Sequence, residues 1–218
     1  MSRSAILVHG LASNWEGSWA EAGWPELLED LDIVALPFEL PGHGASPLAP
    51  DAPPAEVEAA LRATDPAADI AIGFSSGAVY SLRAAAAAPG RFAKLVLLGF
   101  GDGMWTPPGA MAAAADRLLS AEEEPDTRLL RQMAVSAGNS IERVAGFLRA
   151  NPGPPPIEEL AAVTADTLIV LGERDAVGPA DRAAAALPRA RVVVLPGVDH
   201  YRTPGSPGAM AAVLDFLT

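Results

Sequence analysis

Residues 70–88 read IAIGFSSGAVYSLRAAAAA, and this segment indicates the fold class most directly. Its apolar start, Ile70–Phe74, predicts a buried strand, and the Ala-rich part at 77–88 predicts a helix that ends before Pro89-Gly90. The sequence GFSSG at 73–77 lies where the strand turns into the helix. A strand that leads directly into a helix is the repeating unit of α/β proteins with parallel sheets.

The same alternation of strands and helices extends to both sides of this segment. Most of the predicted strands are near-continuous aliphatic runs without polar alternation, which is typical of parallel sheets covered on both faces. We therefore predict an α/β fold with a mostly parallel sheet of about six strands flanked by helices. Besides Ile70–Phe74, the predicted strands are 5–8, 33–36, 95–98, 168–171 and 192–195, and the other predicted flanking helices are 24–31, 56–62, 180–187 and 209–217.

The region from 101 to 164 interrupts this alternation. It contains no good strand pattern, and its helical patterns are separated by proline-rich stretches at 107–108 and 151–156. We interpret the region as a helical cap inserted between two strands of one sheet. Residues 1–100 and 165–218 then form the core, and residues 101–164 form the cap. The helices predicted within the cap are 110–119, 126–136, 140–149 and 157–163.

Ser75 occupies the middle of the GFSSG sequence, and its position suits a nucleophile. Gly73 and Gly77 permit a tight turn, because side chains at these positions would clash with neighbouring backbone. Such a turn lifts the serine hydroxyl clear of the sheet and points the start of the following helix at any oxyanion that forms beside it. A Gly/Ser turn without a function is the alternative interpretation.

Asp175 and His200 each follow a predicted aliphatic strand. The carboxyl ends of parallel strands meet at one edge of a sheet, where open α/β sheets place their sites. A serine hydroxyl needs a base to take its proton, and a carboxylate orients the histidine that does so. Asp175 is therefore the predicted acid and His200 the predicted base, with Asp102 and Asp199 as alternatives for the acid.

The segment 9–11, His-Gly-Leu, follows the first predicted strand. A carbonyl group under attack develops negative charge, which backbone N–H groups stabilise. The N–H groups of Leu11 and of Ser76, the residue after the candidate nucleophile, are the predicted donors. His9 is interpreted as a packed loop residue, and His43, which lies between two glycines, as part of a tight turn in preference to a general base.

Taken together, these motifs resemble the α/β-hydrolase family. The motifs that carry the resemblance are HG at 9–10 after a strand, ELPGHG at 39–44, GFSSG at 73–77, GERD at 172–175 and the late His200. The chain is most similar to the cofactor-independent serine esterase and lyase branch with a helical cap, although Glu39 stands where the family commonly has aspartate. The resemblance also implies a fold shortened at the N-terminus, because two early antiparallel strands of the fuller fold have no counterpart here.

The resemblance implies a serine hydrolase that needs no cofactor. Ser75 would be the nucleophile, Asp175 the acid and His200 the base, and the backbone N–H groups of Leu11 and Ser76 would stabilise the oxyanion. We expect hydrolysis of a carboxylic ester or thioester through an acyl-enzyme on the serine. One alternative is a lyase or carbon–carbon bond hydrolase that uses the same triad for proton transfer. The other is a non-catalytic, ligand-binding member of the fold.

Trp15, Trp105 and Met133 are predicted to line the substrate pocket. Trp15 follows the predicted oxyanion loop, whereas Trp105 and Met133 lie in the cap, whose apolar residues suit an uncharged acyl group. In the same cap, Arg128 and Arg131 lie three residues apart and share a helix face. They are interpreted as solvated charges, with binding of a substrate carboxylate as the alternative.

Composition argues against several other functions. The chain contains no cysteine, which excludes disulfides and thiolate catalysis, and its three histidines are scattered along the sequence. We therefore expect no metal and no cofactor. The net charge of −12 argues against nucleic acid and anionic membranes as partners. The N-terminal residues show no signal-peptide pattern, which together with the lack of cysteine predicts a cytoplasmic location.

Overall fold

The computed structural model describes residues 3–121 and 124–218, so 1–2 and 122–123, which fall within the predicted core and cap, lie outside the described part. The described residues form one sheet of six parallel strands in the order β2-β1-β3-β4-β5-β6. This confirms the predicted fold class. The strands are β1 (Arg3–Val8), β2 (Ile33–Phe38), β3 (Ile70–Phe74), β4 (Lys94–Leu98), β5 (Asp166–Gly172) and β6 (Ala190–Leu195).

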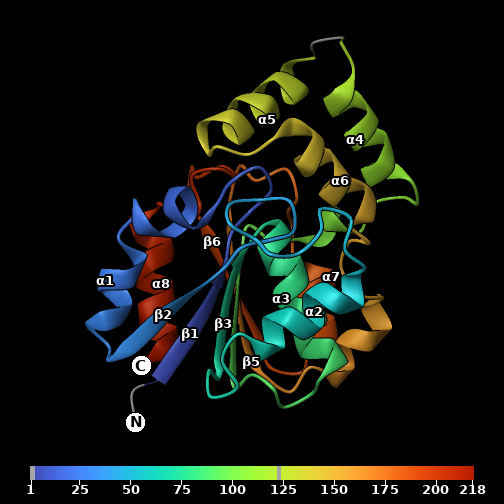
Figure 1. The fold of residues 1–218 in the computed structure, drawn as a ribbon. Coiled ribbons are helices and arrows are strands. Elements are labelled where there is room, and N and C mark those ends of the chain that lie inside the picture. The colour runs from blue at the N-terminus through green and yellow to red at the C-terminus, as the bar shows by residue number, and fades with distance from the viewer. Residues whose placement is uncertain (1–2, 122–123) are drawn as a thin grey trace.

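Helices cover both faces of this sheet (Figure 1). They are α1 (Trp24–Glu29), α2 (Pro54–Ala63), α3 (Ser76–Ala87), α7 (Asp181–Ala186) and α8 (Pro207–Leu217), and a π-helical turn, η1 (Glu16–Ala20), precedes α1. Helices α2, α3 and α7 lie on one face, and α1 and α8 lie on the other. Strand β1 shows why the strands are apolar throughout, because Ile6 and Val8 pack toward the first face while Ala5 and Leu7 pack toward the second.

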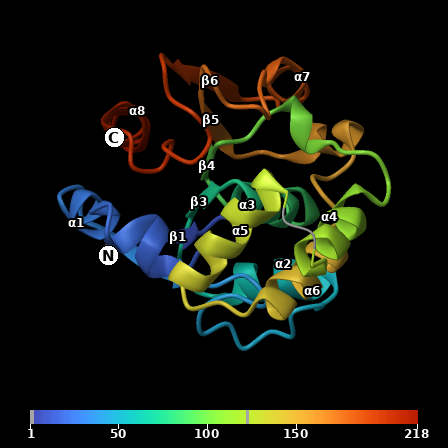
Figure 2. The ribbon, with the colours of Figure 1, turned by 90° about the horizontal axis from the view of Figure 1, so that it is seen from above.

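A group of helices from the chain between β4 and β5 lies over the carboxyl ends of the strands. It comprises α4 (Ala110–Leu119), α5 (Pro125–Ser136) and α6 (Ile141–Ala150), with two 3₁₀ turns, η2 (Asp102–Met104) and η3 (Ile157–Ala162). Figure 1 and, from above, Figure 2 show α4, α5 and α6 gathered at this end of the sheet. The segment 157–163, predicted as a helix, is a 3₁₀ turn at 157–162. Three consecutive prolines precede it, and a proline disfavours helical conformation in the residue before it. We call this group the cap, and the boundaries 101 and 164 stay a prediction.

Strands β2 and β6 form the two edges of the sheet. Strand β2 continues two residues beyond its predicted end and includes Pro37, which an edge strand tolerates because one of its sides makes no ladder hydrogen bonds. Both edge strands present apolar side chains to solvent, with Val34 47% exposed and Val194 54% exposed. The central strands, by contrast, are buried on both faces.

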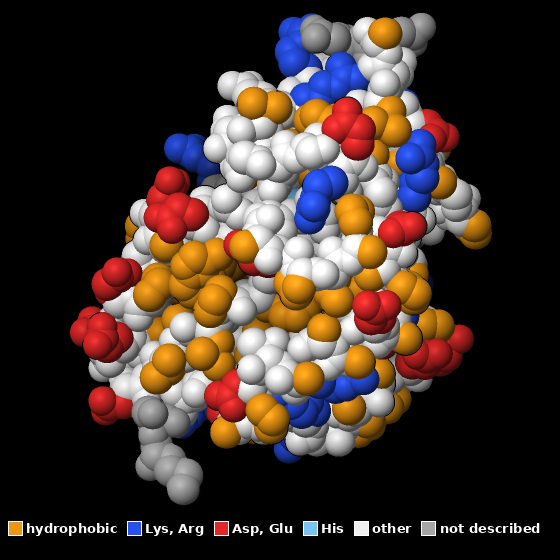
Figure 3. Space-filling view, in the orientation of Figure 1, with side chains coloured by type: hydrophobic (Ala, Val, Ile, Leu, Met, Phe, Trp, Pro, Cys, Tyr) orange, Lys and Arg blue, Asp and Glu red, His pale blue; other side chains and the backbone are white. Residues whose placement is uncertain are grey.

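The negative charge of the chain is dispersed over the surface that Figure 3 displays. Asp and Glu side chains there are scattered among arginines and apolar side chains, and they do not gather into one patch on this face. No helix in the described part of the chain is both long enough and apolar enough to span a membrane.

The register of the strands brings their carboxyl ends together. Gly73 of β3 pairs with Val8 of β1 and with Leu97 of β4, and Gly172 of β5 pairs with Leu195 of β6. Because all of the strands run in the same direction, the residues that follow them meet at one edge of the sheet, beneath the cap. The predicted site residues that follow these strands are Leu11, Ser75, Ser76, Asp175 and His200.

Candidate active site

The turn between β3 and α3 holds Ser75 at this edge of the sheet. Its backbone has φ 53° and ψ −116°, a conformation that residues with a Cβ atom seldom adopt and that costs conformational energy. The turn is also too tight for neighbouring side chains. A Cβ atom at Gly73 would collide with the Gly77 backbone, and one at Gly77 would collide with the Val8 carbonyl oxygen. Both glycines are therefore required by packing.

His200 connects Ser75 to Asp175 through two hydrogen bonds. Its Nε2 lies 2.9 Å from Ser75 Oγ, and its Nδ1 lies 2.8 Å from Asp175 Oδ2. A carboxylate only accepts hydrogen bonds, so Nδ1 carries the proton and Nε2 is free to accept from the serine hydroxyl. The Asp175 side chain is fully buried, and its other oxygen accepts the Val177 N–H at 3.0 Å. The structure thus brings these three predicted residues into one hydrogen-bonded chain.

The two alternative acids have other partners. Asp102 accepts two backbone N–H groups in the first turn of α7, each at 3.0 Å. Asp199 accepts the Arg202 N–H, also at 3.0 Å. Among the described residues, Asp175 is the carboxylate in contact with the His200 ring.

The loop after β1 lies beside Ser75. A Cβ atom at Gly10 would collide with the Phe74 ring and would come within 3.5 Å of Ser75 Cβ, so the loop approaches the serine this closely only with glycine here. Leu11 follows directly, and Ser76 begins α3. The two residues whose N–H groups are the predicted oxyanion donors are therefore both close to the candidate nucleophile.

A second polar cluster packs against this loop. It consists of His9, Glu39 and His43, and the ring centroids of the two histidines are 5.3 Å apart. His9 Nε2 lies 2.8 Å from Glu39 Oε2, and His9 Nδ1–H donates to the Gly10 carbonyl at 2.7 Å. Burial alone would raise the pKa of Glu39, but the hydrogen bond and charge of His9 outweigh this effect, and the pKa lies below its usual value.

His43 is buried in its neutral form. Its Nδ1–H donates to the Pro41 carbonyl at 2.9 Å, and its Nε2 accepts the Ala12 N–H at 2.9 Å. Burial, and then the charge of His9, lower the pKa of His43 from 6.5 to about 3, although Glu39 acts in the opposite direction. A ring with this pKa exchanges no proton near neutral pH, which favours the predicted role in the turn over that of a general base.

This low pKa predicts that stability falls in acid. Below about pH 6.5 an unfolded chain binds a proton at His43, whereas the folded protein does not do so until about pH 3. The free energy of unfolding should therefore fall as the pH drops through this window, by up to about 1.4 kcal/mol per pH unit. His43→Gln keeps an acceptor but cannot titrate, so its stability should depend less on pH. Urea unfolding of both proteins between about pH 7 and pH 5 measures the difference, and equal slopes would contradict the lowered pKa.

A cavity of about 180 Å³ opens beside Ser75. Its other walls include the apolar side chains of Val79, Met104, Met111 and Val177 and the polar ones of Thr106 and Asn151. A larger hollow of about 340 Å³ lies along α1 and β2, but none of the residues that line it belongs to the hydrogen-bonded chain. Ser75 and Ser76, two predicted site residues, also line the cavity, whereas the other wall residues were not among the predicted substrate contacts. For Val79 a signal was present, because it lies one helical turn after the serine and on the same side of α3.

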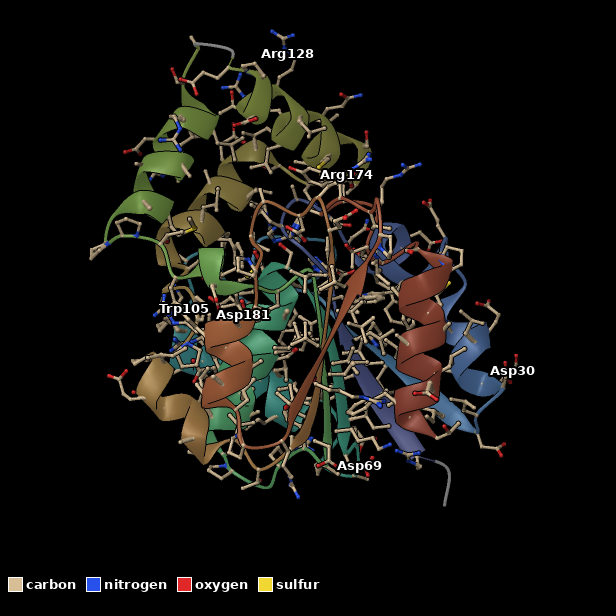
Figure 4. The ribbon with its side chains drawn as sticks, turned by 180° about the vertical axis from the view of Figure 1, so that it is seen from behind. Asp30, Asp69, Trp105, Arg128, Arg174 and Asp181 are labelled. Carbon is tan, nitrogen blue, oxygen red and sulfur yellow. The ribbon has the colours of Figure 1, made fainter. Side chains whose placement is uncertain are left out.

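Trp15, Trp105 and Met133, the predicted pocket residues, do not line this cavity. Trp15 packs against the core on the α1 and α8 side of the sheet, and Met133 lines a different hollow beside η1. Trp105 packs edge-on against Phe100 and donates its indole N–H to the Pro155 carbonyl at 2.9 Å. Figure 4 shows it at the base of the cap. The geometry therefore does not support these three as contacts of a substrate bound in the cavity.

The described residues show no built site for a metal or a substrate carboxylate at the cavity. Arg131 donates to the carbonyls of Leu118 and Ser120 and so ties α5 to the end of α4. Arg128 lies at the far tip of the cap (Figure 4). Neither arginine lines the cavity, and in the described part of the chain no group of three or more His, Asp or Glu side chains is placed so that it could hold a metal ion.

Known proteins share both the sequence pattern and the fold. Residues 5–213 match the family model described as "Alpha/beta hydrolase family". Over 163 residues, the chain is 32% identical to a pimeloyl-[acyl-carrier protein] methyl ester esterase from Methylococcus capsulatus. This match covers 72% of the chain and 63% of the esterase, so the chain spans less than two thirds of that relative's length.

Solved structures extend the similarity over the whole chain. A hydrolase from Pseudomonas aeruginosa PA01 has a TM-score of 0.76 at 24% identity, with 99% of this chain and 90% of that chain covered. MenH from S. aureus has a TM-score of 0.76 at 18% identity, with 100% and 94% covered. BpoC from Mycobacterium tuberculosis H37Rv has a TM-score of 0.77 at 19% identity, with 100% and 92% covered. At identities of 24% or less, these similarities show a shared fold and nothing more specific.

Proposed function

Because the chain belongs to the alpha/beta hydrolase family, we propose that it is a serine esterase that hydrolyses a carboxylic ester or thioester without a cofactor. The observation that carries the proposal is the hydrogen-bonded chain from Ser75 through His200 to Asp175. Similarity to a methyl ester esterase supports an ester as the substrate. The cytoplasmic location and the absence of nucleic-acid or membrane partners stay predictions from the sequence.

The first half of the proposed reaction forms an acyl-enzyme. Ser75 Oγ attacks the carbonyl carbon while its proton passes to His200 Nε2. The buried Asp175 carboxylate, 2.8 Å from Nδ1, stabilises the imidazolium that results. The N–H groups of Leu11 and Ser76 stabilise the oxyanion of the tetrahedral intermediate. The intermediate then collapses as the bond from the carbonyl carbon to the leaving oxygen or sulfur breaks. His200 gives its proton to that atom, which departs as an alcohol or thiol, and the acyl group stays on the serine.

The second half releases the acid by the same chemistry. His200 Nε2 takes a proton from a water molecule as the water oxygen attacks the acyl carbonyl carbon. The second tetrahedral intermediate collapses, the bond to Ser75 Oγ breaks, and the histidine returns the proton to the serine oxygen. Met104 and Met111 of the cap line the cavity beside Ser75, so apolar side chains bound part of the space in which the charged intermediates form.

Labelling with a fluorophosphonate tests this proposal. The probe phosphonylates an activated serine hydroxyl with loss of fluoride. It should attach to Ser75, because His200 removes the proton from that hydroxyl. Peptide mapping by mass spectrometry identifies the labelled residue. A folded protein that takes up no label, or takes it up at another serine, would contradict the proposal. In that case turnover of a 1,3-dicarbonyl or enol substrate would indicate the lyase or carbon–carbon hydrolase alternative.

The cavity predicts a preference for small acyl groups. An apolar cavity of about 150 Å³ holds one benzene molecule, so a volume of about 180 Å³ suits an acyl chain of only a few carbons. The apolar walls favour an uncharged chain, and the net charge of −12 weakly repels anions. For p-nitrophenyl esters of increasing acyl length, we expect kcat/KM to peak at acetate or butyrate. A maximum at long chains, or a strong gain from a terminal carboxylate, would contradict this expectation.

A further inference from the structure

Two histidines outside the triad bind consecutive peptide groups of the loop after β1. His9 Nδ1–H donates to the Gly10 carbonyl, which belongs to the same peptide group as the Leu11 N–H. His43 Nε2 accepts the Ala12 N–H, which belongs to the next peptide group. A trans peptide is planar, so a hydrogen bond to one of its ends also sets the direction of the other. Leu11 thus lies between two peptide planes that are each restrained by a buried ring.

The backbone of Ala12 makes this restraint necessary. Ala12 has φ 59°, in the left-handed region that costs energy for a residue with a Cβ atom. Its side chain is fully buried under the cap, packed among Leu118, Ala134 and neighbouring residues. If the Ala12 N–H had no acceptor, the loop could adopt conformations of lower backbone energy. The 2.9 Å bond to His43 opposes them.

His43 is well suited to this task because it is rigid and stays neutral. Its Nδ1–H is held by the Pro41 carbonyl, and its ring packs edge-on against Phe147 with centroids 5.1 Å apart. The side chain is completely buried. Its pKa of about 3 keeps the Nε2 lone pair available throughout the neutral range.

We propose that His43 is a positioning residue for oxyanion stabilisation, which holds the Leu11–Ala12 peptide and so aims the Leu11 N–H at the reacting carbonyl oxygen. This inference rests on the proposed function, because it requires that Ser75 generates an oxyanion beside the loop. The experiments below therefore measure quantities that depend on the negative charge of the oxyanion, namely kcat and the binding of an inhibitor that forms an oxyanion.

Other side chains hold the remainder of the loop in the same way, which supports the assignment. Asn139, between α5 and α6, donates from Nδ2 to the Ser13 carbonyl at 2.9 Å. Glu39 accepts the Trp15 N–H at 3.1 Å. Compared with Asn139 and Glu39, His43 acts closer to Leu11, because it holds the peptide group next to the one that carries the Leu11 N–H.

Two substitutions separate the acceptor from the packing of the ring. His43→Phe fills a similar volume but has no acceptor, whereas His43→Gln places an amide oxygen within reach of the Ala12 N–H. Loss of an oxyanion donor itself costs about 10²- to 10³-fold in kcat. For hydrolysis of p-nitrophenyl butyrate we therefore expect His43→Phe to lower kcat by about 10- to 100-fold with little change in KM. His43→Gln should recover most of the loss.

A trifluoromethyl ketone provides an independent readout. An activated serine adds to its carbonyl carbon, and the oxygen of the resulting hemiketal is an oxyanion. Its inhibition constant should rise in His43→Phe by the same factor as kcat falls. Phe147→Leu is the matched control, since it loosens the packing of the same ring but leaves the acceptor in place. It should lower stability while kcat and the inhibition constant stay near the values of the unchanged protein.

Given an active wild type, three results would overturn the inference. They are a kcat of His43→Phe equal to that of the wild type, an equally large loss of kcat in Phe147→Leu, and no recovery of kcat in His43→Gln. Should His43→Phe fail to fold, nitrogen NMR of the histidines in the unchanged protein decides instead. An unprotonated Nε2 coupled to the Ala12 N–H between about pH 5 and pH 8 supports the assignment, and a protonated Nε2 ends it. A wild type that neither reacts with fluorophosphonate nor hydrolyses esters refutes the proposed function itself.

Discussion

Ser75→Ala is expected to lower kcat on the order of 10⁶-fold, the loss seen when the nucleophile of a comparable triad is removed. Without Oγ no acyl-enzyme forms, and the hydrogen bond to His200 Nε2 is lost. The fold should persist, because alanine keeps the Cβ atom and meets the φ of 53° no worse than serine does. The measurement is steady-state hydrolysis of p-nitrophenyl butyrate together with the circular dichroism spectrum.

Ser81→Ala is the matched control for this substitution. Ser81 lies on the same helix, α3, and is fully buried, but it does not line the cavity beside Ser75. Its hydroxyl has no hydrogen-bond partner among the described residues, so its removal should leave both kcat and the fold intact. A Ser75→Ala protein that keeps more than a small part of its activity would assign the nucleophile elsewhere.

Asp175→Asn is expected to lower kcat by about 10⁴-fold, the second-largest effect. The carboxylate keeps the His200 proton on Nδ1 and stabilises the imidazolium. An asparagine amide presents an NH₂ group as well as an oxygen, so the ring is no longer held with Nε2 as the acceptor for the serine proton.

Asp102→Asn and Asp199→Asn are the controls, since each removes one charge from the same edge of the sheet. Asp102 accepts two N–H groups in the first turn of α7, one on each oxygen. Asparagine keeps only one of these acceptors, so the substitution should cost about 1 kcal/mol of stability with kcat retained. Asp199 accepts one N–H in an exposed turn, and its substitution should have a smaller effect. A greater loss of kcat in Asp102→Asn than in Asp175→Asn would indicate that Asp102, in the loop after β4, is the acid of the triad.

Most of the fold was predictable because its signals are local. The aliphatic runs predict strands that are buried on both faces, and the structure places Ile6 and Leu7 of β1 in two separate cores for this reason. The exceptions lie at proline. Strand β2 passes through Pro37 because it is an edge strand, and 157–163 forms a 3₁₀ turn after consecutive prolines. Hydrophobic periodicity shows neither the edge position of β2 in the sheet nor the effect of prolines on the segment that follows them.

The fold class and the three residues that the proposed reaction needs could be predicted from the sequence alone. Parallel strands bring whatever follows them to one edge, so that Ser75, Asp175 and His200 were expected to meet although 125 positions separate the first from the last. Their catalytic roles stay predictions until the substitutions above are made.

Contacts between side chains that are far apart in the sequence could not be predicted in the same way. Three aspartates follow strands at the same edge, yet the hydrogen bond that selects Asp175 depends on how the loops after β5 and β6 lie against each other, which places Asp175 Oδ2 2.8 Å from His200 Nδ1. The cavity walls and the bond from Ala12 to His43 likewise join segments whose spacing in the sequence carries no periodic signal. The physical reason is that hydrogen bonds and cavities require positions correct to a fraction of an ångström, which long-range packing sets and local propensity does not.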